Sequence, residues 1–274
     1  MIGNSLERRR YILFWIIAFV IMVIAGAYQR RTGPTYEMKG RAAVGDVVVR
    51  YELTRTHPGA GDQEVRFPVA AGDIQGTLVW KRHGLDEPWQ EIPMSRDGED
   101  LEGFLPHQPP AGKLDYKVRL DRGALSVMLP DEGYAITRFR GDVPAVVLLS
   151  HIFFMFVGLM FSTRAGIEAL ADGDQARRIA LQGFVLLFIG GMILGPIVQK
   201  YSFGAFWAGV PFDWDLTDNK TLIFIVVWGW ALWKSRGGRR ARWSLVTAAA
   251  ITLLVYLIPH SVLGSELDYS KIDT

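Results

Sequence analysis

The sequence predicts a multi-domain membrane protein in which an α-helical transmembrane bundle of about five spans carries an inserted all-β sandwich domain. Apolar residues concentrate at the start and after residue 143, whereas residues 29–142 contain 16 Lys and Arg and 18 Asp and Glu. Apolar runs of about 20 residues are long enough to cross the hydrocarbon layer, and short alternating runs are typical of half-buried strands. The lipid bilayer is therefore an expected partner of the chain.

The first predicted span is residues 11–28, which follow a cytoplasmic N-terminus at residues 1–10. A cleaved signal peptide is the competing interpretation, because Ala25, Gly26 and Ala27 match a small-residue cleavage pattern. The apolar run is long for a signal core, so we favour an anchor.

The other predicted spans lie within the bundle at residues 143–264, at about 143–163, 180–199, 216–233 and 244–264. The third of these contains Gly191 and Gly195, a small-xxx-small spacing that favours close helix packing. The span at 216–233 is the weakest, because Lys220 and Lys234 would both have to extend toward the membrane interfaces. Four spans in total are the main alternative.

The orientation of the chain in the membrane is predicted from the Lys and Arg residues of the short segments outside the spans. Such residues are retained on the cytoplasmic side. Eleven lie on one side, before residue 11, between 164 and 178, and between 234 and 242, against three on the other. This bias predicts a cytoplasmic N-terminus, with residues 29–142 and the tail at 265–274 outside. The expected location is the cytoplasmic (inner) membrane of a bacterium, and we expect the tail to be solvated.

Between residues 45 and 141 the pattern changes to period-two alternation. It is clearest at residues 47–53 and 113–120, and shorter runs occur at residues 65–69, 74–80, 89–94, 101–105, 125–129 and 134–139. Turn clusters rich in Gly, Pro and Asp separate these runs. Such spacing resembles that of an immunoglobulin or fibronectin type III sandwich. The domain at 29–142 is therefore expected to bind an extracytoplasmic or membrane protein partner.

Several functional classes are excluded by composition. The chain has no cysteine, so disulfides, thiolate metal sites and cysteine nucleophiles are absent. The soluble region has no basic stripe of the kind that binds nucleic acid. His57, His83 and His107 fall in or beside turns, where we expect exposed side chains without a role. Because no nucleophile with a positioned base can be identified, an enzyme is not expected.

Two histidines lie within predicted spans, where polar groups are costly and therefore candidates for function. His151 falls in the early part of the span at 143–163, and His260 near the end of the span at 244–264, where Pro259 could bend the helix. Both would occupy the outer leaflet. A neutral imidazole is a ligand for haem iron, so His151 and His260 could together hold one haem. The alternative is that each hydrogen-bonds a neighbouring helix.

The loop before residue 216 adds aromatic and acidic residues. Trp207, Trp214 and Asp215, with Gly204, Phe206 and Thr217 or Thr221, resemble the tryptophan-rich loop of cytochrome c assembly proteins that handle haem. The resemblance covers residues 204–221 with His151 before and His260 after, although AGVPFD makes the tryptophan spacing longer. It implies haem as the cofactor. The alternative is that the tryptophans anchor the interface and Asp215 caps a helix.

Three functions are compatible with the sequence. The first is binding or handling of haem through His151 and His260, with Trp207, Trp214 and Asp215 near the macrocycle. The second is a non-catalytic assembly factor or accessory subunit that docks an external partner through the sandwich. The third, a transporter, has the least support because the spans contain few charges and no repeat.

Overall fold

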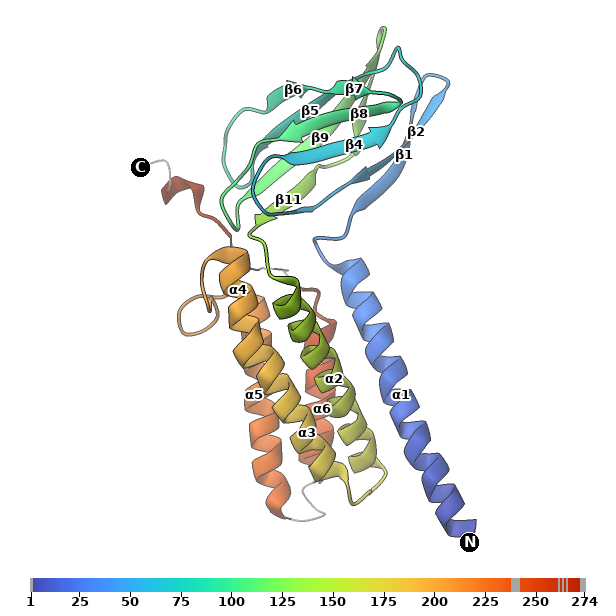
Figure 1. Ribbon diagram of the computed structural model, residues 1–274, viewed down its shortest axis with the longest axis vertical. Coiled ribbons are helices and arrows are strands. Elements are labelled where there is room, and N and C mark those ends of the chain that lie inside the picture. The colour runs from blue at the N-terminus through green and yellow to red at the C-terminus, as the bar shows by residue number, and fades with distance from the viewer. Residues whose placement is uncertain (1, 238–241, 261, 263, 265, 272–274) are drawn as a thin grey trace. The chain divides into compact units, whose positions relative to one another are not determined.

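The computed structural model divides the chain into two compact units (Figure 1). One comprises residues 1–34 and 143–264, and the other residues 35–142 and 265–274. The structure describes residues 2–237, 242–260, 262, 264 and 266–271, so Arg239 and Arg240, two of the cations used to predict orientation, lie outside the described residues. Each unit has its own cluster of buried apolar side chains.

The helical unit follows the predicted apolar segments. Its elements are α1 (Ile2–Thr32), α2 (Ala145–Leu170), α3 (Ala176–Phe188), the π-helix η1 (Ile189–Leu194), α4 (Gly195–Phe203), α5 (Leu216–Lys234), the short 3₁₀ turn η2 (Ser235–Gly237) and α6 (Arg242–Leu257). Within the described part of the chain, three segments are long and apolar enough to cross a membrane: Glu7–Thr32, Ala145–Leu170 and Ala176–Phe203. The helix Arg242–Leu257 is apolar but shorter.

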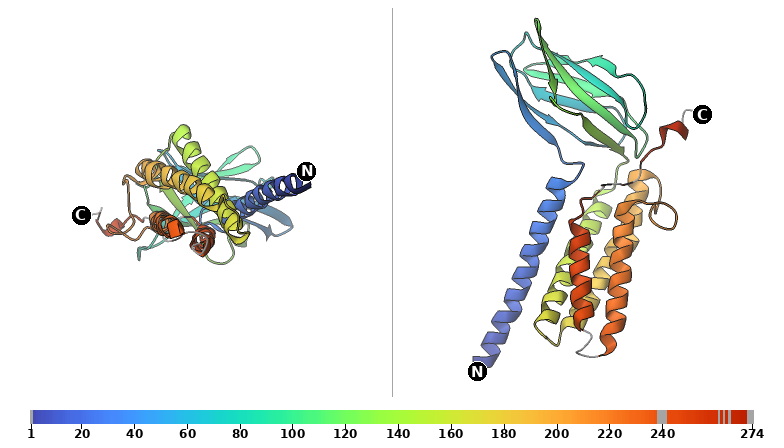
Figure 2. Two further views of the ribbon diagram at one scale, coloured as in Figure 1. Left: turned by 90° about the horizontal axis from the view of Figure 1, so that it is seen from below. Right: turned by 180° about the vertical axis from the view of Figure 1, so that it is seen from behind.

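Glycines allow the helices of this unit to approach closely. A Cβ at Gly190 would lie 3.0 Å from the backbone nitrogen of Met155 in α2, and one at Gly191 would lie 2.5 Å from Cγ2 of Thr221 in α5. Such contacts need residues without side chains. The close packing predicted for Gly191 and Gly195 is confirmed at Gly191, whereas a Cβ at Gly195 would make only ordinary contacts, the nearest at 3.6 Å. Figure 2 shows α5 and α6 side by side.

The last helix is shorter than predicted. It ends at Leu257 rather than near residue 264, because Pro259 has no amide hydrogen and disfavours a helical conformation at the preceding residue. His260 therefore lies in a turn beyond the helix, and its side chain is exposed.

The second unit is a β domain. Its strands are β1 (Met38–Val44), β2 (Val47–Leu53), β3 (Thr56–Pro58), β4 (Gln63–Pro68), β5 (Gln75–Arg82), β6 (Gln90–Pro93), β7 (Ser95–Asp97), β8 (Asp100–Leu105), β9 (Lys113–Arg122), β10 (Leu125–Leu129) and β11 (Ala135–Arg140). All eight predicted strands are confirmed, whereas β1, β3 and β7 were not predicted.

The strands form three sheets, and all their pairs are antiparallel except β11 with β3. A two-stranded sheet pairs β1 with β2, a three-stranded sheet has the order β4-β8-β7, and a six-stranded sheet has the order β3-β11-β9-β5-β6 with β10 beside β9. Alternating side chains of β5 and β9, such as Leu78 and Val118, are fully buried, which explains the period-two pattern of the sequence.

Candidate functional sites

The first predicted site residue, His151, is held against the π-helix. Its Nδ1 lies 2.8 Å from the carbonyl oxygen of Gly190, which also accepts a hydrogen bond from the Gly195 amide. Because a carbonyl oxygen only accepts, Nδ1 carries the proton and Nε2 keeps its lone pair. The alternative interpretation, a hydrogen bond to a neighbouring helix, is confirmed for His151. The same bond orients the ring in the manner common to metal-binding histidines.

His260 lies among different neighbours. A Cβ at Gly33, just beyond the end of α1, would lie 3.9 Å from the His260 carbonyl oxygen. The described residues contain no group of three or more His, Asp and Glu that could hold a metal ion.

Side chains at the start of α5 accept hydrogen bonds from the loop between α4 and α5. Asp215 is the N-cap, and its side chain accepts hydrogen bonds from the amides of Thr217 and Asp218. The Asp218 carboxylate accepts from the Ala208 amide at 2.6 Å, and Asn219 accepts from Val210 at 2.8 Å. The capping interpretation of Asp215 is therefore confirmed, and the carboxylate that would face a ligand is engaged with backbone amides.

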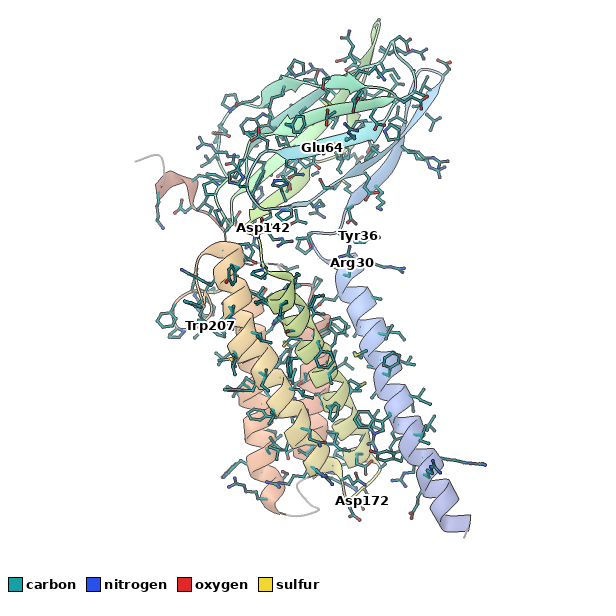
Figure 3. All side chains as sticks on the ribbon, in the orientation of Figure 1. Arg30, Tyr36, Glu64, Asp142, Asp172 and Trp207 are labelled. Atoms are coloured by element: carbon teal, nitrogen blue, oxygen red, sulfur yellow. The ribbon has the colours of Figure 1, made fainter. Side chains whose placement is uncertain are left out.

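The two tryptophans of this loop differ in environment. Trp207, labelled in Figure 3, is half-buried and donates from Nε1 to the Val210 carbonyl at 3.2 Å. Trp214 is 80% exposed, as is Phe212, and Phe206 is 59% exposed. A rigid loop therefore displays three large aromatic side chains. This suits an apolar contact such as a membrane interface, where tryptophan is enriched.

A lysine at the same end of the helical unit is buried. Lys220 is only 4% exposed, and its Nζ donates to the Ile258 carbonyl at 2.9 Å. The end of α6 at Leu257 leaves the Ile258 carbonyl free of the helix to accept this bond. A buried ammonium needs such partners, so the termination of α6 explains the position of Lys220.

The β domain carries a groove of about 780 Å³ beside β2 and β4. It is lined by Lys39, Gly40, Arg41, Arg50, Tyr51, Glu52, Thr54, Arg66, Phe67 and Pro68. The Tyr51 ring covers Gly40, at a position where a Cβ would collide with it. Each of these two strands pairs on one side only, β2 with β1 and β4 with β8, so both present an edge without a strand partner.

A second feature of the β domain is a histidine-carboxylate pair. Nδ1 of His83 lies 2.6 Å from Oδ1 of Asp115, and Asp115 is 2% exposed. Burial raises the pKa of Asp115, and the hydrogen bond with His83 offsets part of that rise. The expectation that His83 is exposed is thus wrong, because its side chain is half-buried against β9, where Asp115 faces it.

The C-terminal tail packs onto the β domain at the same place. The Leu267 amide donates to the Ala111 carbonyl, and the Tyr269 hydroxyl both donates to the Lys113 carbonyl and accepts from the Lys113 amide, at 3.0 and 2.9 Å. Tyr269 is 6% exposed, and burial raises its pKa to about 12. The expectation of a solvated tail is therefore wrong at Tyr269.

Comparisons with known proteins identify no relative: no protein family, no curated protein and no solved structure matches this chain.

Proposed function

We propose that this chain is a membrane-anchored docking protein: its helices cross the membrane, and its β domain binds a protein partner on the extracytoplasmic face. The single observation that carries the proposal is the groove of about 780 Å³ beside β2 and β4. Strand edges without a partner are recognition surfaces for other chains. In this role the protein acts as a non-catalytic assembly factor or accessory subunit.

The tail supports an odd total number of spans, which includes the five-span arrangement. Tyr269 is bound to Lys113 of the β domain, so both must lie on the same side of the membrane. The chain between residues 142 and 265 therefore crosses an even number of times. Two crossings, by α2 and by α3 with α4, satisfy this condition, and so do four, with α5 and α6 added. Together with α1 the total is then three or five spans. Four spans in total would place the tail on the wrong side.

Single cysteines test this topology, because the chain has none of its own. Asp86→Cys in the β domain and Lys271→Cys in the tail should react with a membrane-impermeant thiol reagent in intact cells of a bacterial host. Gln175→Cys, exposed between α2 and α3, should react only after permeabilisation. Protection of Lys271→Cys in intact cells would reject the five-span arrangement.

Site-specific crosslinking tests the docking role. A photoreactive amino acid at Pro68, exposed at the end of β4 and lining the groove, should give a defined adduct in native membranes. The same group at exposed Asp86, which is not among the residues that line the groove, is the control. Equal adducts from both positions, or none from Pro68, would contradict docking in the groove.

Haem binding at His151 is the second candidate. The observation that favours it is the fixed Nδ1–H of His151, which leaves Nε2 as a potential axial ligand. His260 lies in a turn beyond α6, and the two-histidine site stays a prediction. A detergent-purified chain supplied with haem should then show a Soret band that His151→Phe removes and His260→Phe does not. Absence of the band would end this candidate.

A further inference from the structure

Two arginines face each other across the hairpin that borders the groove. In the antiparallel register of β1 with β2, Arg41 is the direct partner of Arg50, and both side chains are exposed. Like charges placed directly opposite destabilise a strand pair. The Arg41–Arg50 pair therefore lowers the stability of the hairpin. Binding of a partner would explain why such a pair is present.

The surrounding charges do not offset this pair. Glu52 is 2.8 Å from Lys39, its own cross-strand partner. Arg66 of β4 contacts Glu64 at 2.9 Å, Asp97 at 2.7 Å and Glu102 at 3.0 Å; Glu64 is labelled in Figure 3. The structure records no ion pair for either Arg41 or Arg50 with any described residue. The positive charge without a counter-charge in the groove is therefore concentrated at these two arginines.

The rest of the groove suits an extended chain. Tyr51, which is half-buried, and exposed Pro68 supply apolar surface beside the charged residues. The unpaired edges of β2 and β4 supply backbone donors and acceptors, the groups through which an extended segment adds to a sheet. Arginine forms strong, charge-assisted and frequently bidentate hydrogen bonds with carboxylates.

We propose that the groove binds an extended acidic segment of the partner protein, with two of its carboxylates held by Arg41 and Arg50. The inference rests on the proposed docking function and specifies the chemistry of the partner. Apolar residues of the segment pack against Tyr51 and Pro68, and its backbone runs along a strand edge. The bound carboxylates supply the counter-charge that the Arg41–Arg50 pair lacks.

Peptide binding to the full chain in detergent tests the charge preference. The probe is a fluorescent eight-residue peptide of alternating Glu and Val, compared with one of alternating Lys and Val. We expect the Glu peptide to bind more tightly, and each of Arg41→Gln and Arg50→Gln to weaken it on the order of tenfold. The double variant Arg41→Glu/Arg50→Glu should reverse the preference. Equal binding of both peptides, or no effect of the variants, would overturn the proposal.

Stability supplies a second, independent readout. Because Arg41→Glu converts a like-charge pair into an opposite-charge pair, it should raise the thermal midpoint of the full chain while abolishing binding of the Glu peptide. A structural role for Arg41 predicts the reverse, a lower midpoint. Lys39→Glu, which creates a like-charge pair with Glu52, is the matched control and should lower the midpoint. A lower midpoint for Arg41→Glu would also overturn the proposal.

The docking function and the acidic segment would be rejected by different results. An adduct from Pro68 in native membranes, without preference for the Glu peptide, would retain docking and reject the acidic segment. Preference for the Glu peptide without any adduct from Pro68 would show an anionic peptide site but reject the docking function.

Discussion

Lys220 and Ile258 are joined within the helical unit: Nζ of Lys220 donates a hydrogen bond to the Ile258 carbonyl oxygen at 2.9 Å. The bond links α5 to the residue just after α6, and Lys220 is only 4% exposed, whereas Ile258 is 37% exposed. It fixes the position of the segment that leads from the helices to the C-terminal tail.

Replacement of this lysine should destabilise the helical unit. Lys220→Met would leave the Ile258 carbonyl without its donor, at a cost of about 1–3 kcal/mol, measurable as a lower thermal midpoint in detergent. Lys200→Met is the matched control, because Lys200 also donates to a carbonyl, that of Gly204, but at an exposed site. Equal decreases in the thermal midpoint for the two variants would show that the burial of Lys220 does not matter for stability.

Close packing at the glycine-rich helix predicts a second effect. Gly191→Ala would place a Cβ 2.5 Å from Cγ2 of Thr221, and overpacking of this kind typically costs about 1–3 kcal/mol. Gly229→Ala in α5 is the control, because a Cβ there meets nothing within 4 Å. It should be neutral or stabilise the helix by up to about 1 kcal/mol. Thermal unfolding of both variants, each compared with the parent chain, decides between these outcomes.

Attachment of the tail should depend on the Tyr269 hydroxyl. Tyr269→Phe keeps the ring and removes both hydrogen bonds to Lys113, so amide hydrogen exchange at Lys113 should become faster. Tyr201→Phe, at an exposed tyrosine of α4, should leave that exchange unchanged. Unaltered exchange in Tyr269→Phe would mean that the tail does not protect the strand.

The attachment of the tail should also depend on pH, through ionisation of the Tyr269 hydroxyl. Burial raises the pKa of Tyr269 from the ordinary 10.0 to about 12, so the docked tail favours the neutral phenol. Its stabilisation is complete below about pH 10 and is lost as the pH rises through about 12. The difference in phenolate absorbance between the parent and Tyr269→Phe should therefore appear near pH 12. A difference centred near pH 10 would indicate a solvated tail.

Replacement of the buried Arg164 should cause the largest loss of stability. Arg164 is 0% exposed, pairs with Glu168 at 2.7 Å and lies over the rings of Tyr11, Phe14 and Trp15 in α1 at 5.3, 5.2 and 5.5 Å. Arg164→Met leaves the Glu168 carboxylate without its partner, which typically costs about 3–5 kcal/mol. The double variant Arg164→Met/Glu168→Met should recover much of that loss in thermal unfolding. No recovery would show that the aromatic contacts matter more than the charge.

The sequence allowed the regular elements to be predicted, because their burial follows a simple period. Strand β2 was expected at residues 47–53 and begins and ends there, since its alternate side chains face the core. Strand β1 was missed, because Gly40, Ala42 and Ala43 give little alternation of hydrophobicity. Its register against β2, and hence the Arg41–Arg50 pair, depends on the hairpin turn at Gly45, whose φ is +68°.

The candidate sites were predictable only where the interaction is local. The cap formed by Asp215 involves residues two and three positions further along the chain, so the sequence pattern was sufficient to indicate it. The partners of His83 and Lys220 lie 32 and 38 residues away, and no local pattern identifies them. The position of His260 was misjudged because Pro259 ends the helix rather than bending it.

The docking of Tyr269 also sets an order of events during synthesis. Residues 35–142 leave the ribosome before any of the helices α2 to α6, yet the last contacts of their fold come from a segment translated afterwards. The β domain is therefore completed only after residues 143–264 have been synthesised. A nascent chain that has not yet reached Leu267 and Tyr269 lacks the tail contacts at Ala111 and Lys113.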